Sequence, residues 1–148
     1  MSREIKFRAK TLAQDVWCYG SYFEHIKRQV GPIGDSLKDE DIEHVMISSS
    51  FADWNMPRVI TATLVNPNTV GQFIGFRDKN KKEIYEGDLI RINDKEDLYK
   101  VEWNEDNAAF ILITIDFIKA DFDCYYTGEL EVVGNVYDNP ELIKECEW

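Results

Sequence analysis

The sequence predicts a mostly β fold, a β-rich α+β arrangement with a small barrel or sandwich in its C-terminal half. Three observations carry this prediction: a strict apolar–polar alternation near the N-terminus, a series of short strand-like runs separated by polar turns, and one good helix start near the C-terminus. With 148 residues and an apolar share of 44%, the chain can bury a core. It has room for one domain, or for one domain with an appended hairpin.

The clearest element is an N-terminal strand over residues 3–9. Ile5 and Phe7 lie on one face of this stretch, and Lys6 and Arg8 lie on the other. A period of two over that length is typical of a strand with one buried face.

The next elements are less regular. Residues 16–23 are rich in aromatic side chains and predict a second strand, which would close a hairpin on the first. Residues 28–58 contain the dipeptide Gly31-Pro32 and several acidic residues. They predict a long irregular or partly helical excursion, with a short helix around 39–46.

From Val59 the strand pattern returns. Further strands are predicted at residues 59–64, 70–77, 83–85, 89–92, 98–103, 109–115 and 130–137. A short helix follows, with Asn139 as its N-cap and Pro140 at the first helical position, where the missing N–H of proline costs nothing. We therefore expect an N-terminal strand or hairpin packing on the barrel (1–27), the excursion (28–58), and the barrel with its helix (59–148).

Composition indicates a soluble, cytoplasmic protein. No stretch of the sequence approaches the ~20 apolar residues of a membrane span, and the charged N-terminus lacks the apolar core of a secretory signal. The net charge is −11, from 17 basic and 28 acidic residues, and such a chain repels phosphate backbones. General nucleic-acid binding is therefore disfavoured. The basic residues gathered in 1–28 are expected to pair with acidic strands elsewhere, a local basic face being the alternative.

The cysteines and histidines form no metal-binding pattern. Cys18, Cys124 and Cys146 are an odd set without a Cys-x-x-Cys pair, and His25 and His44 lack partners at metal-site spacing. Reduced thiols in a reducing compartment fit this pattern, and we expect no metal and no cofactor. A nucleophile assembled in space from Cys18 or Cys124 with a histidine is the alternative.

The polar segment from Asp78 to Glu83 has a weak likeness to a calcium loop. Asp78, Asn80 and Glu83 offer oxygen ligands, but the required glycine and the later ligands are missing, and three lysines interleave the segment. A hairpin turn explains the same residues, because Asp and Asn bond their own backbone and tolerate unusual φ.

A second turn follows at Glu86-Gly87-Asp88. Glu83, Glu86 and Asp88 place three carboxylates within six residues, and paired carboxylates can perform acid–base chemistry. The structural interpretation is favoured here. Tyr85 precedes a tight turn that feeds a buried strand, Gly87 supplies a positive φ, and Asp88 bonds backbone amides across the turn. We expect no catalytic residues.

Apolar residues outside the barrel strands are the candidates for contacts with a partner. Ile42, Val45 and Met46 share one face of the predicted helix, which suits docking into a groove. Trp54 and Trp148 lie outside every predicted strand, and an aromatic side chain there can bind a partner at low entropic cost.

Three blocks of sequence resemble the YopX family, small proteins encoded mainly by bacteriophages and prophages. They are residues 3–9 (REIKFRA), 73–90 (FIGFRDKNKKEIYEGDLI) and 133–142 (VGNVYDNPEL), in the family order. The middle block is the most specific. This chain has Lys81 where the family commonly has glycine after Asn, and Lys10 where it commonly has tryptophan. The first difference weakens the prediction of an Asn-Gly type I′ turn.

The resemblance implies a phage-derived, β-rich protein whose C-terminal part is similar to an SH3-like barrel. It implies no catalytic residues, since the family supplies no activity to transfer. The shared motif residues are those that the turn analysis already assigns to architecture.

The function hypothesis is a non-enzymatic interaction module that binds a host or phage protein in the cytoplasm of the bacterial host and forms a homo-oligomer. The alternative is an acidic mimic of nucleic acid, or an inhibitor of a nucleic-acid-binding protein, suggested by the net charge of −11. An enzyme that uses the carboxylates of Glu83, Glu86 and Asp88 is the third and weakest hypothesis.

Overall fold

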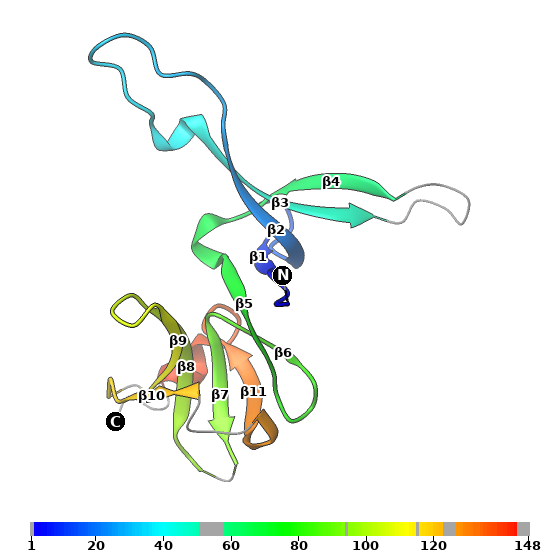
Figure 1. The fold of residues 1–148 in the computed structure, drawn as a ribbon, viewed down its shortest axis with the longest axis vertical. Coiled ribbons are helices and arrows are strands. Elements are labelled where there is room, and N and C mark those ends of the chain that lie inside the picture. The colour runs from blue at the N-terminus through cyan, green and yellow to red at the C-terminus, as the bar shows by residue number, and fades with distance from the viewer. Residues whose placement is uncertain (1, 51–57, 94, 115, 123–126, 145–148) are drawn as a thin grey trace. The chain divides into compact units, whose positions relative to one another are not determined.

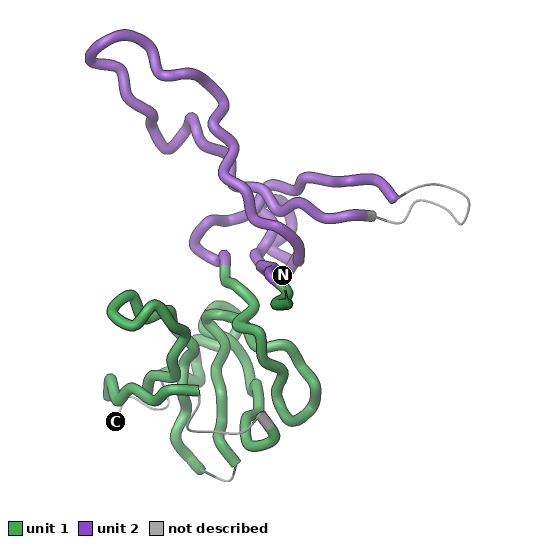
Figure 2. The backbone as a smooth tube through the Cα atoms, in the orientation of Figure 1, with its two compact units in different colours: residues 1–4, 71–148 green, residues 5–70 purple. Residues whose placement is uncertain are grey.

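The chain folds into two compact units of antiparallel β-structure. The computed structural model describes residues 2–50, 58–93, 95–114, 116–122 and 127–144. Unit 2 contains residues 5–70, and unit 1 contains residues 1–4 and 71–148 (Figure 2). The predicted boundary at 58/59 differs from this division, which falls at 70/71.

Unit 2 is built on four antiparallel strands in the order β4-β3-β2-β1 (Figure 1). They are β1 (Phe7–Lys10), β2 (Trp17–Ile26), β3 (Ile42–Ser50) and β4 (Val59–Leu64). Short 3-10 helices at Asp39–Asp41 and Pro67–Thr69 precede β3 and follow β4. The predicted N-terminal hairpin is confirmed, since β1 pairs with β2 with Phe7 opposite Gly20.

The core of unit 2 lies on one face of this sheet. Ala9, Met46 and Val65 are buried there, and Phe7 and Tyr22 are among the half-buried side chains packed against them. Successive side chains of a strand point to opposite faces. The alternation of β1 predicted from the sequence therefore places Phe7 and Ala9 on the core side.

The predicted helix around 39–46 is wrong. Only the 3-10 turn at 39–41 is helical, and residues 42–50 form β3, which pairs with β2 on one side and β4 on the other. Val45 and Met46 therefore point to opposite faces of a sheet instead of sharing a helical face. The pairing partners of β3 are distant in sequence, and local periodicity does not reveal them.

Unit 1 contains a five-stranded antiparallel sheet in the order β10-β9-β8-β7-β11 and a β5–β6 hairpin. Its elements are β5 (Gly71–Arg77), β6 (Glu83–Tyr85), β7 (Asp88–Ile92), β8 (Leu98–Asn104), β9 (Ala109–Thr114), β10 (Lys119–Asp121), β11 (Leu130–Asn135) and α1 (Pro140–Lys144). A 3-10 turn at Thr127–Glu129 precedes β11.

The core of unit 1 collects alternate residues of the sheet. Ile90, Val101 and Leu112 are almost completely buried, and Ile84 of the hairpin packs with them. The mostly β fold and the short C-terminal helix starting at Pro140 are confirmed. Among the described strands the order β10-β9-β8-β7-β11 is open at both ends, so closure into an SH3-like barrel stays a prediction.

The connection between β2 and β3 is held by one arginine. The guanidinium of Arg28 donates to both carboxylate oxygens of Asp35 at 2.8 and 3.1 Å, and its Nε lies 3.0 Å from Asp41 Oδ2. These contacts with Arg28 hold the pKa of Asp35 and of Asp41 below the ordinary value. The excursion predicted as irregular therefore has a specific electrostatic clamp.

Acidification is expected to loosen this connection. A carboxylate whose folded pKa is lowered stabilises the fold above its unfolded pKa of about 3.9, and the stabilisation is lost as the pH falls through the folded value. Heteronuclear NOE values of residues 28–41 should therefore drop between about pH 6 and pH 2.5. The variant Arg28→Gln should show low values already at the higher pH. Equal values at both pH values in the parent would contradict the clamp.

Candidate interaction surface

The motif carboxylate Asp78 is a structural centre of unit 1. Its side chain is buried, with 5% of the residue exposed. Oδ1 accepts hydrogen bonds from the backbone N–H of Asn80 and of Lys82, both at 2.9 Å, and Oδ2 accepts from Val132 N–H at 3.0 Å. Asp78 therefore shapes the β5–β6 turn and ties it to β11. Its oxygens point at backbone donors, which agrees with the turn interpretation rather than with a calcium loop.

The second turn of the motif has the geometry that the sequence indicates. Gly87 has a φ of 88°, and Asp88 Oδ2 accepts a hydrogen bond from Tyr85 N–H at 2.8 Å. The N–H of Gly87 donates to the carbonyl of Val101 at 2.9 Å, and its carbonyl accepts from Val136 N–H at 3.0 Å. The turn between β6 and β7 is thus bonded to β8 through Val101 and to the residue after β11, Val136.

The remaining motif carboxylates also have structural partners. Glu83 lies 3.8 Å from the guanidinium of Arg77, and Glu86 Oε1 accepts a hydrogen bond from Gln72 N–H at 3.3 Å. In the described part of the chain there is no group of three or more Cys, His, Asp or Glu residues able to hold a metal ion. The contacts of these carboxylates favour an architectural role for the motif.

The thiol of Cys18 is half-buried and bonded to the backbone. It donates a hydrogen bond to the carbonyl of Ala9 at 3.3 Å, and burial raises its pKa. His25 instead lies beside Glu43, with 3.3 Å between Nδ1 and Oε2. Reactive cysteines usually have a lowered pKa, so the direction of the shift at Cys18 is opposite to the one that activates a thiol. Cys124, the other candidate, lies outside the described residues.

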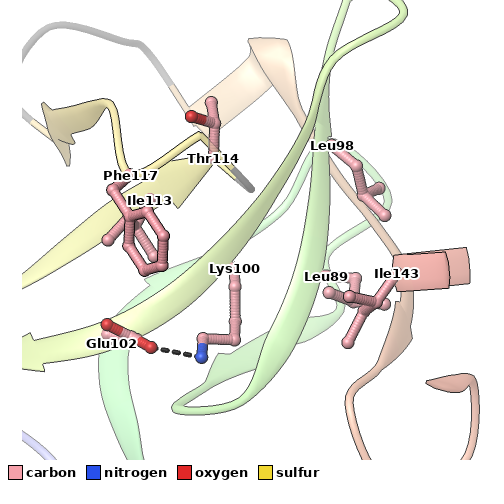
Figure 3. Close-up of a pocket in the computed structure, with 8 residues that line it drawn as sticks. All are labelled: Leu89, Leu98, Lys100, Glu102, Ile113, Thr114, Phe117 and Ile143. Carbon is pink, nitrogen blue, oxygen red and sulfur yellow. Dashed lines mark ion pairs between the residues drawn. The ribbon is translucent and has the colours of Figure 1, made fainter. Parts of the chain in front are cut away.

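A small apolar pocket lies on the outer face of the five-stranded sheet, opposite the core (Figure 3). The register explains it, because Leu89 lies opposite Lys100 and Lys100 lies opposite Ile113. These residues alternate with core residues along their strands and therefore share the other face. The pocket has a volume of about 190 Å³. Its lining residues are Leu89, Leu98, Lys100, Glu102, Ile113, Thr114, Phe117 and Ile143.

The walls of the pocket come from outside the sheet. Phe117 precedes β10, has a φ of 62° and is 80% exposed, and Ile143 is supplied by α1. Figure 3 shows Phe117 and Ile113 at one end, Leu89 and Ile143 at the other, and Lys100 between them. Lys100 pairs with Glu102, so the charge on the floor is neutralised within the pocket.

A second hollow in unit 1 is lined by aromatic side chains. Trp103 meets Phe110 edge-on with 5.0 Å between ring centroids, and Phe76 stacks on Phe122 at 5.9 Å. Trp103 and Phe76 are both exposed. Aromatic rings with one open face are typical contact groups of protein interfaces.

The family follows from a comparison with known proteins. The family model described as "YopX protein" matches residues 6–144, which is most of the chain and includes nearly all three sequence blocks. This chain belongs to the YopX family. The resemblance seen in the sequence is therefore confirmed.

One relative and one solved structure extend the comparison. The chain is 29% identical over 112 residues to the "SPbeta prophage-derived uncharacterized protein YopX" of Bacillus subtilis (strain 168), covering 67% of this chain and 81% of the relative. The crystal structure of protein EF1440 from Enterococcus faecalis is similar with a TM-score of 0.52 and 19% identity. The match covers 96% of this chain and 99% of EF1440, and it shows a likeness in fold.

The YopX family motif and the predicted partner contacts fall in different places. The motif residues 78–88 form the two turns described above. Met46 is buried in the core of unit 2, and Val45 lies on the opposite face of the same sheet. Ile42 is the first residue of β3. The remaining two candidates, Trp54 and Trp148, lie outside the described residues.

The pocket of this YopX family member was not predicted from its sequence. The signal was present in the continuous apolar run from Ala108 to Ile113, because a strand that buries both faces loses its alternation.

No helix in the described part of the chain is long and apolar enough to cross a bilayer; α1 has five residues.

Proposed function

We propose that this chain is a non-enzymatic protein-interaction module of phage or prophage origin, acting in the cytoplasm of the bacterial host. It binds a host or phage protein through the apolar pocket of unit 1, and it associates with itself. The observation that carries the proposal is an apolar pocket whose wall residue Phe117 is 80% exposed. A contiguous exposed apolar surface is typical of a protein interaction site or a binding groove, and Phe117 continues the apolar lining of the pocket to the surface.

The size of the pocket favours a side chain over a metabolite. Small-molecule sites usually have volumes of roughly 300–1,000 Å³. The pocket of unit 1 has about 190 Å³ and is lined by aliphatic and aromatic side chains around one ion pair. It suits one apolar anchor residue of a protein partner, the kind of contact that dominates many interfaces.

The architecture of unit 1 supports a module rather than an enzyme. The family carboxylates have backbone or ion-pair partners, and the Asp78 turn ties the β5–β6 hairpin to β11. The hydrogen bond from Val132 N–H to Asp78 also supports the proposal that unit 1 is an SH3-like barrel. In such a barrel the β5–β6 hairpin helps to close the sheet at its β11 end. Such barrels present rigid surfaces to their partners.

A pair of adjacent variants tests the proposal. Phe117→Asp places a charge on the pocket wall, whereas Ile118→Asp places the same charge one residue away, at an exposed position that does not line the pocket. Parent and variants are used as baits in lysate of infected or lysogenic host cells. We expect a protein that the parent and Ile118→Asp retain and that Phe117→Asp loses by at least tenfold.

Retention by all three baits would contradict a role for the pocket.

A salt titration of the complex distinguishes the proposed function from the alternative, an acidic mimic of nucleic acid, which the net charge of −11 favours. Mimicry predicts binding that weakens steeply with ionic strength and ignores Phe117→Asp. Binding through an apolar anchor is expected to change little between about 0.1 and 0.5 M salt.

A further inference from the structure

Among the described residues, no strand pairs with one side of β4. It lies at the end of the unit 2 sheet and pairs with β3 alone among the described strands (Figure 1). An open edge of this kind presents a row of backbone donors and acceptors to another chain. The feature belongs to unit 2 and is separate from the pocket of unit 1.

Two hydrogen bonds identify the backbone groups that face outward. The N–H of Val65 donates to the carbonyl of His44 at 2.9 Å, so Val65 faces β3. The carbonyl of Leu64 accepts from Leu12 N–H at 3.1 Å on the other side. Because the direction alternates along an antiparallel strand, Ile60 and Ala62 also direct their N–H and C=O groups away from β3. The open edge is therefore centred on Thr61.

The side chains of β4 lack the charges and the proline that usually protect an edge strand. Its sequence, Val-Ile-Thr-Ala-Thr-Leu, has no charge, proline or glycine, and Ile60 is 76% exposed. Edge strands are usually kept from pairing by charges, proline, bulges or short length. The unit 1 sheet uses such devices at both ends, since β10 has three residues, two of them charged, and β11 contains Glu131 and a bulge between Val132 and Gly134.

We propose that β4 pairs antiparallel with β4 of a second copy of this chain, around a two-fold axis through Thr61. Ile60 then lies opposite the partner's Ala62, and Ala62 opposite the partner's Ile60. Each of these residues has one outward donor and one outward acceptor, so the two pairs form four hydrogen bonds without disturbing β3 or the Leu12–Leu64 bond. The sheet of unit 2 becomes continuous across the two copies.

Side chains and charge both favour a second copy as the occupant. Residues that oppose each other in an antiparallel pair lie on the same face. The large side chain of Ile60 therefore meets the small side chain of the partner's Ala62. Thr61 meets the partner's Thr61, and Thr63 meets the partner's Val59. Two chains that each carry −11 repel one another, and an uncharged strand lets them approach with the least repulsion. A strand of the same sequence supplies both the backbone and the side-chain complement.

A disulfide across the axis tests the register. Thr61 would face the partner's Thr61 in a non-hydrogen-bonded pair with Cα atoms about 4.5 Å apart, inside the disulfide range of about 4.4–6.8 Å. The two copies of Thr63 would be four residues out of register, roughly 13 Å apart at about 3.3 Å per residue. In a background with the native cysteines replaced by alanine, mild oxidation should convert most Thr61→Cys protein into covalent dimer and leave Thr63→Cys monomeric on a denaturing gel.

The edge itself is tested by Ala62→Pro, which removes an outward N–H and no hydrogen bond to β3. Light scattering should give a mass that is a multiple of 17.3 kDa for the parent and a smaller multiple for this variant, whose circular dichroism spectrum stays that of the parent. The inference rests on the self-association in the proposed function but not on the pocket.

The outcomes separate the two proposals. A monomeric parent overturns self-association and β4 pairing together, while loss of partner capture by Phe117→Asp would still support the pocket. An oligomeric parent whose Thr61→Cys and Thr63→Cys variants cross-link equally overturns β4 pairing alone. An oligomer that survives Ala62→Pro unchanged does the same.

Discussion

Replacing Asp78 with alanine is expected to lower the free energy of unfolding by about 2–4 kcal/mol. The change removes the acceptor of three backbone N–H groups. Those of Asn80 and Lys82 lie in an exposed turn and can bond water, but Val132 belongs to a buried part of β11. A buried donor without an acceptor costs its full desolvation, about 1–3 kcal/mol. The loss of one link between the hairpin turn and β11 adds to this, although the N–H of Lys79 still donates to the carbonyl of Leu130 at 2.9 Å.

Urea denaturation measures the effect, with two control variants. Asp78→Asn keeps one acceptor oxygen and should lose less stability than Asp78→Ala. Asn80→Ala leaves every hydrogen bond of the Asp78 carboxylate in place, since Asn80 contributes its backbone N–H, and should change stability by less than about 0.5 kcal/mol. Equal midpoints for Asp78→Ala and the parent would mean that the three hydrogen bonds carry no stability.

The turn at Asp78 shows which part of a structure the sequence can predict. The bonds from Asn80 and Lys82 are local, and the Asp-x-Asn pattern predicts them because short polar side chains bond their own backbone in turns. The bond from Val132 joins residues 54 positions apart. Nothing in a single sequence links those positions, so the role of Asp78 in tying together two strands emerges only from the fold.

Lys81 makes a related point about backbone strain. The sequence disfavours an Asn-Gly type I′ turn here, because Lys81 stands where the family commonly has glycine. The structure nevertheless gives Lys81 a φ of 64°, in the left-handed region, and its N–H donates to the carbonyl of Asp78 at 2.9 Å. The turn is therefore shaped by hydrogen bonds around Asp78, which hold a lysine in a conformation that glycine would adopt more easily.

The helix predicted over residues 39–46 was wrong because long-range strand pairing decides the structure of this segment. Ile42, Val45 and Met46 fit a helical period of 3.6, but a strand also fits any short apolar run. The decision is made by β2 and β4, which pair with β3 on both sides and bury Met46 in the core of unit 2. Long-range pairing overrides local periodicity there, as the β-branched residues of the segment permit.

Gly87→Val is expected to destabilise unit 1 by roughly 1–3 kcal/mol. Gly87 has a φ of 88°, which a β-branched residue rarely adopts, and a Cβ at this position would lie 3.1 Å from the ring of Tyr137. Its N–H and carbonyl are bonded to Val101 and Val136, so the backbone cannot relax without breaking contacts to two other segments. Backbone strain and crowding therefore act together.

A second glycine separates these two causes. Gly75 has a φ of 97°, but a Cβ there meets no atom within 4 Å. The variant Gly75→Val should therefore report the cost of backbone strain alone, and Gly87→Val should melt at a lower temperature than Gly75→Val. For a unit of roughly 60–100 residues, such as unit 1, a loss of 1 kcal/mol in the free energy of unfolding lowers Tm by about 4–8 °C. If Gly87→Val melted within a degree or two of the parent, the turn at Gly87 would not constrain unit 1 in the way its hydrogen bonds indicate.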